Sequence, residues 1–311
     1  MNMKTVYLNK FMSSVVAELE MNGQYGTAHV CGSVLRSVMA FGGEGLPVSG
    51  ITPLWLKAYE GYLLHKGGKG LAWNTVSTYM RMLQAVYNRA VVRKLAAFIP
   101  HQFRDVFTGR KADHRRVLER DDMQKLLVER DPDITSPGMA WARACLELMF
   151  RFHGMPFVDL AHLRKSDLKD GYLTLRRRKT GMPLSARVDG RAMQLLERYR
   201  NRDDTSPYLL CFLDGNLEGM AAYRDYQRIL RLLNSRLRVL ALWKKVQGKV
   251  TSYSARHTWA TVGRYCHIPI EVISEGLGHA SVTTTEGYMK GFGNSRMDRA
   301  NKVIMNYIFK G

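Results

Sequence analysis

The sequence predicts a mainly helical α+β protein of two domains, both mostly helical, the second holding a small antiparallel sheet. Apolar residues recur at helical spacing in a series of segments, of which the first is 5–21 and the last is 282–289. Two short runs of strand-forming residues flank one turn signal, Lys179-Thr180-Gly181, which is typical of a hairpin. A basic stretch without periodicity, 101–117, separates two helical regions and is predicted to be a linker.

The first predicted domain, residues 1–100, consists of four helical segments. Thr52-Pro53 starts the third with an N-cap residue and a proline at the first helical position. Glycines at 23, 42–43 and 67–68 end the first three segments. Four basic residues lie largely off the apolar stripe of the fourth, where they either bind a polyanion or form a solvated face: Arg81, Arg89, Arg93 and Lys94. The predicted segments are 5–21, 26–41, 52–67 and 74–96.

The second predicted domain, residues 118–311, contains seven helical segments and two strands. A further apolar stretch at 303–309 is predicted to pack either on a neighbouring protomer or on its own domain. The predicted helices are 120–129, 137–153, 190–201, 221–245, 254–266, 269–277 and 282–289, and the strands are 171–178 and 184–188.

The chain carries a formal charge of +20 in 311 residues, which favours a polyanionic partner. Residues 1–115 hold 14 Lys/Arg and 6 Asp/Glu, a net charge of +8, so both halves are expected to touch that partner. DNA and RNA fit this charge equally well. Basic candidates in the linker are Arg110, Lys111, Arg115 and Arg116.

Several classes of site are absent from the sequence. Gly67-Gly68-Lys69-Gly70 lacks the spacing of a nucleotide-binding loop, and no metal-binding spacing of Cys and His occurs. We therefore expect no cofactor and no metal. The four cysteines have apolar neighbours and are interpreted as reduced core residues of a cytoplasmic protein. No signal peptide is recognised, and no apolar run approaches the roughly 20 residues of a membrane span.

Three segments carry chemistry-bearing residues in a fixed order. They are Gly154-Met155-Pro156-Phe157-Val158-Asp159-Leu160, Tyr253-Ser254-Ala255-Arg256-His257-Thr258, and Leu277-Gly278-His279 followed nine residues later by Tyr288. Together, with Lys179 between the first two, they resemble the catalytic domain of the tyrosine recombinase (phage integrase) family. The resemblance covers about 118–295, and the helical first domain is similar to that family's SAM-like core-binding domain.

The resemblance implies a role for each matching residue. Tyr288 would be the nucleophile, Arg256 and His279 would bind the scissile phosphate, and Lys179 would protonate the leaving 5′-oxygen. Phosphodiester transesterification needs these residue types, because a phenol can attack phosphorus while planar guanidinium groups neutralise the phosphoryl oxygens. The energy of the broken bond is kept in the phosphotyrosine, so no ATP is required.

Two positions depart from the family pattern. Tyr253 stands where a histidine is usual, and a phenol is a poor base at neutral pH. Pro156 stands where the family has its first arginine. Arg151 is the first candidate to replace that arginine and Arg178 is the second; the alternative for Arg151 is a salt bridge to an acidic residue elsewhere.

The resemblance implies a site-specific recombinase that acts through a covalent 3′-phosphotyrosine, with integration, excision and inversion all open. Its partners would be double-stranded DNA with inverted core sites and further copies of the chain, as a dimer on one site and a tetramer in the synapse. A type IB topoisomerase and a non-catalytic DNA-binding regulator remain alternatives. Only an enzyme would become covalently attached to DNA.

Overall fold

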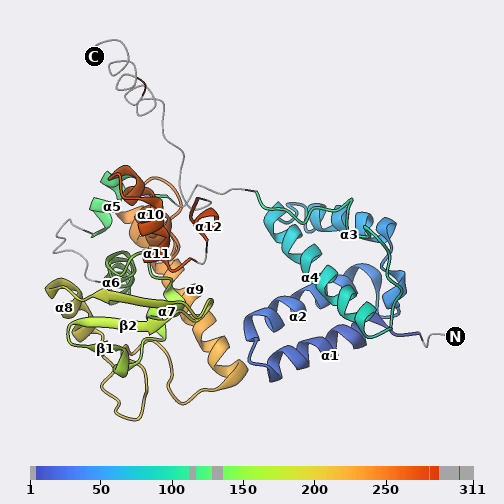
Figure 1. Cartoon of the computed structure of the whole chain (residues 1–311), viewed down its shortest axis with the longest axis horizontal. Coiled ribbons are helices and arrows are strands. Elements are labelled where there is room, and N and C mark those ends of the chain that lie inside the picture. Colours follow the sequence, from blue (N-terminus) through green and yellow to red (C-terminus); the bar gives the residue numbers. More distant parts are fainter. Residues whose placement is uncertain (1–4, 112–116, 128–135, 280, 287–300, 302–311) are drawn as a thin grey trace. The chain divides into compact units, whose positions relative to one another are not determined.

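The computed structural model describes residues 5–111, 117–127, 136–279, 281–286 and 301, and it divides into two compact units (Figure 1). The first comprises Met1–Ala112 with Glu218–Tyr223, and the second comprises Asp113–Leu217 with Arg224–Gly311. Both are mostly helical and the second contains one antiparallel sheet, so the predicted fold class is confirmed. None of the described helices is long and apolar enough to cross a membrane.

The helices of the first unit bury the apolar stripes that the sequence predicts. Leu8, Met12 and Val15 of the first helix and Met80 and Leu83 of the fourth are essentially inaccessible to solvent. The third begins as expected, with the Thr52 side chain accepting a hydrogen bond from the backbone N–H of Trp55. The elements are α1 (Leu8–Met21), α2 (Tyr25–Gly42), a 3-10 turn (Val48–Gly50), α3 (Pro53–His65) and α4 (Trp73–Val92).

The fourth helix ends four residues before its predicted end. Lys94 adopts a left-handed conformation with φ of 57°, and the backbone N–H groups of Lys94 and Leu95 bond back to Val91 and Ala90. This is a Schellman end, which glycine normally forms, so a lysine there gives no stop signal in the sequence.

The segment after α4 folds back along the first unit as far as Lys111. Buried Glu60 accepts a hydrogen bond from the backbone N–H of Phe107 at 2.7 Å, and Ser77 donates to the carbonyl of Gly109 at 2.6 Å. The side chain of Asn74 pairs with both backbone groups of Lys111 at 2.8 Å. Much of the predicted linker, 101–117, is therefore held on the first unit by side chains of α3 and α4.

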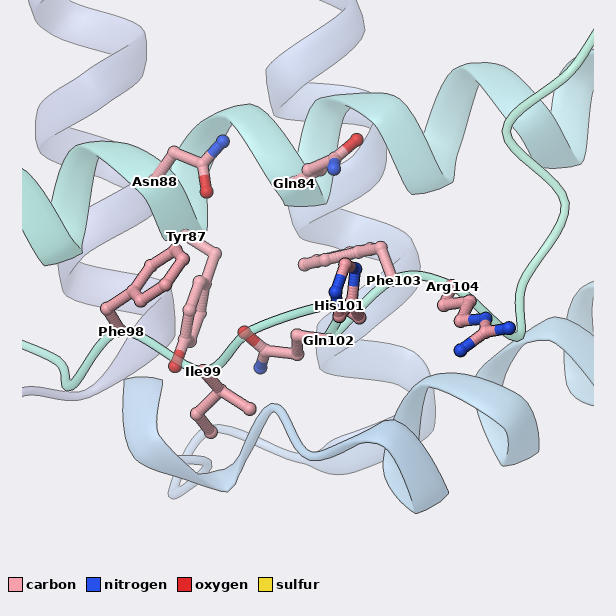
Figure 2. Close-up of a pocket in the computed structure, with 9 residues that line it drawn as sticks. All are labelled: Gln84, Tyr87, Asn88, Phe98, Ile99, His101, Gln102, Phe103 and Arg104. Carbon is pink, nitrogen blue, oxygen red and sulfur yellow. The ribbon is translucent and has the colours of Figure 1, made fainter.

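A hollow of about 420 Å³ opens between α4 and residues 98–104 (Figure 2). Tyr87, Phe98 and Phe103 supply aromatic walls, while Gln84 and Asn88 supply amide groups from α4. The Tyr87 hydroxyl donates to the carbonyl of Ala97, which ties this segment to the helix.

In the second unit, α6 is the centre of the core, since nearly all residues from Ala142 to Met149 are buried. The elements are α5 (Arg120–Leu127), α6 (Pro137–Arg151), α7 (Phe157–Ala161), a 3-10 turn (Lys165–Asp167), β1 (Leu168–Lys169), β2 (Tyr172–Arg176), β3 (Pro183–Arg187), α8 (Gly190–Arg198), α9 (Gly219–Trp243), α10 (Ser254–Tyr265), α11 (Ile270–Leu277) and α12 (Val282–Glu286). The predicted segment at 303–309 and the end of the one at 282–289 lie outside the described residues.

The three strands pair antiparallel in the order β1-β2-β3. Leu173 opposes Ala186 and Leu175 opposes Leu184 on the face that packs on the core. Side chains alternate along a strand, so Arg177 continues the inward row of Leu173 and Leu175 directly after β2 ends. Arg177 is accordingly only 5% exposed.

The cysteine prediction is correct for two residues and wrong for two. Cys31 and Cys145 are buried, whereas Cys211 and Cys266 are exposed. Cys211 lies in a turn and Cys266 directly follows α10, so apolar neighbours in the sequence do not bury them.

We expect Glu60→Ala to lower the free energy of unfolding by about 1–3 kcal/mol, because it leaves the partly buried N–H of Phe107 without its acceptor. Urea denaturation measures this. Glu44→Ala is the control, because Glu44 is exposed. A loss no larger than that of the control would contradict the role assigned to Glu60.

Candidate active site

Arg256 is held in the second unit by backbone carbonyl groups. It lies in the first turn of α10 and is 5% exposed. Its Nη1 donates to the carbonyl of Gly154 at 3.0 Å, and its Nη2 donates to the carbonyl of Leu277 at 2.7 Å. The three predicted segments therefore meet at one guanidinium group.

Gly154 allows this close approach. Its φ is 66°, which a side chain disfavours, and a Cβ there would lie 2.9 Å from the Cα of Arg256. The glycine in the first segment is thus required by the packing of α10 against the end of α6.

Arg177 is a second buried arginine at the same place. Its Nη1 donates to the carbonyl of Leu277, the group that also accepts from Arg256. Its Nε pairs with Asp159 at 3.2 Å, and both side chains of that pair are about 95% buried or more. Two cationic side chains therefore converge on one carbonyl oxygen, with Asp159 balancing the charge of Arg177.

Asp159 fastens the hairpin to α7. One carboxylate oxygen accepts from Arg177, and the other accepts from the backbone N–H of Arg178 at 2.9 Å. Gly278 completes the contact, because a Cβ there would lie 2.5 Å from the Cδ of Arg177. Any side chain at position 278 would displace Arg177.

His279 lies between Arg256 and α12. Its Nε2 is 2.7 Å from Nη2 of Arg256, and its Nδ1 is 2.8 Å from the hydroxyl of Thr285. A guanidinium group only donates, so Nε2 accepts and Nδ1 carries the proton of a neutral ring. Burial, followed by the charges of Arg256, Arg177 and Lys179, lowers the pKa of His279 to about 4.

Lys179 and Tyr253 are on the surface near this cluster. Lys179 lies exposed in the hairpin turn, and its charge is among those that lower the pKa of His279. Tyr253 precedes α10 and is 42% exposed, with its ring 6.2 Å from the ring of His257. Neither is buried with the two arginines.

Arg151 is engaged elsewhere, in contrast to the prediction that it replaces the missing arginine. Its Nε bonds Glu147 at 3.0 Å and its Nη1 bonds Asp189 at 2.6 Å. Glu147 is buried and also pairs with Arg191. This is the salt-bridge alternative, and it arises because Arg151 ends α6 beside the start of α8. The second candidate, Arg178, is exposed and contributes its backbone N–H to the site.

Tyr288 lies outside the described residues. The described element that precedes it in the chain, α12, ends at Glu286. Thr285 of α12 is buried and its hydroxyl bonds His279, so α12 is attached to the arginine cluster.

The basic candidates of the first unit differ in their surroundings. Arg89 and Arg93 both pair with Glu18, which reduces their effective charge. Lys111 lies over the ring of Trp73, with Nζ 4.3 Å from its centroid. The others described, Arg81, Lys94 and Arg110, are exposed, whereas Arg115 and Arg116 lie outside the described residues.

One further basic surface was not identified from the sequence. Arginines at helical spacing form an exposed stripe on α9, where Arg228 pairs with Asp225 at 2.7 Å. The i, i+4, i+7, i+14 spacing was available in the sequence as a signal. The members of this arginine stripe are Arg224, Arg228, Arg231 and Arg238.

Within the described part of the chain, no group of three or more His, Cys, Asp or Glu side chains could hold a metal ion. The cluster at Leu277 instead presents donors, which suit the oxygens of a phosphate.

Comparison with known proteins places the chain in a family. A model of the phage integrase family matches residues 116–292, more than half of the chain, and a model of the phage integrase SAM-like domain matches residues 7–104. The chain belongs to the phage integrase family. The resemblance found in the sequence is thereby confirmed. The SAM-like match lies in the first unit, and the other match lies in the second unit apart from Glu218–Tyr223.

Among curated proteins, tyrosine recombinase XerA of Pyrococcus furiosus is 29% identical over 140 residues, which cover 44% of this chain and 46% of the relative. The matched part thus spans about half of that relative's length.

Solved structures of integrases share the fold. A lambda integrase dimer bound to a core site has a TM-score of 0.63 at 16% identity and covers 93% of this chain and 97% of that one. The Tn1549 transposon integrase in complex with transposon right end DNA has a TM-score of 0.65 at 15% identity, covering 98% and 100%.

The pKa of His279 predicts a pH dependence of stability. Between pH 6.5 and about 4 the unfolded chain binds a proton at this position and the folded protein does not, so stability falls as the pH decreases through that window. His279→Gln should reduce this slope. Urea denaturation from pH 7 to 4 measures it, with exposed His65→Gln as the control. His162, whose pKa is also lowered to about 4, mainly by burial, should keep part of the slope in the variant. An unchanged slope in His279→Gln would contradict the assignment.

Proposed function

We propose that this protein is a site-specific recombinase that cleaves and rejoins DNA through a 3′-phosphotyrosine on Tyr288. The observation that carries the proposal is the convergence of Arg256 and Arg177 on the carbonyl of Leu277, with His279 bonded to Arg256. Tyr288 follows His279 by nine residues in the sequence. Two guanidinium groups at one point are suited to binding the two non-bridging oxygens of a phosphodiester.

In the proposed reaction, the phenolic oxygen of Tyr288 attacks phosphorus, its proton passes to solvent, and the bond to the 5′-oxygen breaks. Arg256 and Arg177 stabilise the charge that develops on the non-bridging oxygens. The leaving 5′-oxygen takes a proton from Lys179. Attack by a 5′-hydroxyl of another strand reverses these steps, releasing Tyr288 and joining new ends.

Arg177 takes the role of the arginine that Pro156 replaces. This assignment differs from the choice of Arg151, whose guanidinium group is bonded to Glu147 and Asp189. A phosphate entering between the arginines would also replace His279 as an acceptor for Arg256. In the other neutral tautomer, the imidazole would donate from Nε2 to a phosphate oxygen while the Thr285 hydroxyl donates to Nδ1. Tyr253 would lie at the edge of the site.

Double-stranded DNA is the proposed substrate, with inverted core sites, a dimer on each site and a tetramer in the synapse. The net charge of +20 and the arginine stripe on α9 support a nucleic-acid partner. Solved integrases of the same fold include a dimer on a core site and a lambda integrase tetramer bound to a Holliday junction. The product would be an integrated, excised or inverted segment.

Tyr288→Phe removes the attacking oxygen and leaves the cationic surfaces intact. We expect a nicked core-site substrate to trap the wild-type protein covalently and the variant not at all, while both bind DNA with similar affinity. Denaturing electrophoresis detects the trapped complex. A wild-type protein that binds but never becomes attached would instead favour a non-catalytic regulator, and relaxation of supercoils by a monomer would favour a topoisomerase.

Arg177→Ala should lower the cleavage rate by about 100- to 1,000-fold, since a donor to the developing charge is lost. Arg151→Ala and the neighbouring Arg178→Ala should cleave within a few-fold of wild type. Removing Arg177 also leaves Asp159 buried without its partner. Arg177→Lys, which keeps the charge beside Asp159, is therefore measured together with Arg177→Ala. Melting temperatures are measured for all variants.

Normal cleavage by a folded Arg177→Ala variant would be evidence against this role. A large loss in Arg151→Ala with an unchanged melting temperature would restore Arg151 as the replacement.

A further inference from the structure

His279 has a fixed backbone position at the end of α11. Gly278 adopts a left-handed conformation with φ of 61°, and its backbone N–H bonds to the carbonyl of Glu275 at 2.7 Å. The backbone N–H of His279 itself bonds to the carbonyl of Ser274 at 3.0 Å. These bonds end the helix and hold the Cα of His279, so the direction of its imidazole ring depends on side-chain contacts.

Two side chains hold that ring between them. Nη2 of Arg256 lies 2.7 Å from Nε2, and the hydroxyl of Thr285 lies 2.8 Å from Nδ1. Thr285 belongs to α12, which packs against α11, and it is fully buried, whereas Thr283 and Thr284 are exposed. A buried hydroxyl is costly unless it forms a hydrogen bond, and His279 provides one. The hydroxyl therefore engages the ring nitrogen opposite to the one that meets Arg256.

The ring nitrogen Nε2 meets opposite demands before and during the proposed reaction. A guanidinium group only donates, so Nε2 accepts from Arg256 and Nδ1 carries the proton. An ionised phosphodiester only accepts, so Nε2 must carry the proton when the scissile phosphate becomes its partner. Burial, followed by the charges of Arg256, Arg177 and Lys179, lowers the pKa of His279 to about 4, which disfavours a ring with both protons. A neutral ring has to change tautomer to meet both demands.

A hydroxyl is suited to both tautomers. It accepts a hydrogen bond from Nδ1–H in one of them, and it rotates to donate its own proton to a bare Nδ1 in the other. The separation of 2.8 Å between Nδ1 and the oxygen of Thr285 fits either direction. A carboxylate in this place would only accept and would keep the proton on Nδ1, while an ammonium group would only donate.

We propose that Thr285 is a positioning residue that orients His279 and allows its ring to change tautomer when a phosphate binds. This inference rests on the proposed function. One proton leaves Nδ1 for water and another joins Nε2 from water, so the net charge of the ring stays the same. His279 is partly exposed, which permits this exchange. Thr285 acts on the phosphate only through His279.

NMR spectroscopy follows the tautomer of His279 without any cleavage. Chemical shifts of the imidazole nitrogens distinguish a protonated nitrogen from a bare one, and the His279→Gln variant assigns the signals. We expect the proton on Nδ1 in the DNA-free protein. We expect it on Nε2 when Tyr288→Phe, which lacks the attacking oxygen, is saturated with core-site DNA. The same proton position in both states, or a doubly protonated ring in the complex, would overturn the proposal.

Thr285→Val keeps the shape of the side chain and removes the hydroxyl. We expect the rate of covalent trapping at saturating protein to fall about fivefold to tenfold, the worth of one hydrogen bond. Affinity for the core site should stay within about twofold, because the basic surfaces are unaltered. Thr285→Ser, which keeps the hydroxyl, should restore the rate. Thr284→Val, which removes an exposed hydroxyl from the same helix, is the matched control.

A double-mutant cycle separates an action through His279 from a loss of structure in α12. His279→Phe keeps a planar ring and removes both nitrogens, so Thr285→Val should slow trapping by less than about twofold in that background. An equal loss in both backgrounds would mean that Thr285 acts independently of His279, and the proposal would be wrong. If Thr285→Val does not fold, the nitrogen shifts of the protein with Thr285 intact decide the question.

The proposal also fails if Thr285→Val traps DNA at the wild-type rate or if Thr284→Val loses as much as Thr285→Val. Absence of trapping by the wild-type protein would overturn the proposed function itself. Normal trapping by the wild-type protein without the change of tautomer would overturn the role of Thr285 alone.

Discussion

The carbonyl oxygen of Leu277 accepts hydrogen bonds from Arg177 and from Arg256, and the candidate active site is arranged around this shared acceptor. One arginine follows strand β2 and the other lies in the first turn of α10, while the carbonyl belongs to the end of α11. Like charges repel, so this arrangement requires compensation. Asp159 supplies a carboxylate to Arg177, and the carbonyl groups of Leu277 and Gly154 supply dipoles to Arg256.

Two glycines satisfy the steric demands of the same arrangement. Gly154 admits the backbone of Arg256, and Gly278 admits the side chain of Arg177. These contacts explain why the first and third segments each contain a glycine at a left-handed backbone position. The neutral state of His279 follows from the same cluster, because burial and neighbouring cations disfavour a further positive charge.

The two units contribute differently to the proposed binding and cleavage of DNA. In the first unit, buried Glu60 and Ser77, together with Asn74, hold the chain in place up to Lys111. The second receives the chain at Thr258, beside the arginine cluster. Exposed arginines on α9 extend the basic surface within the second unit.

The sequence by itself determined the fold class, most helices and the family, because apolar periodicity and the three short segments are local properties of the chain. It did not determine which arginine accompanies Arg256. Arg151 precedes Gly154 closely in the sequence, yet α8 offers it Asp189; Arg177 is 79 residues from Arg256 and meets it at Leu277. The inward row of β2 could have indicated Arg177, but its acceptor lies 100 residues away along the chain. Only the tertiary structure decided the pair, since it depends on segments distant in sequence meeting at one carbonyl oxygen.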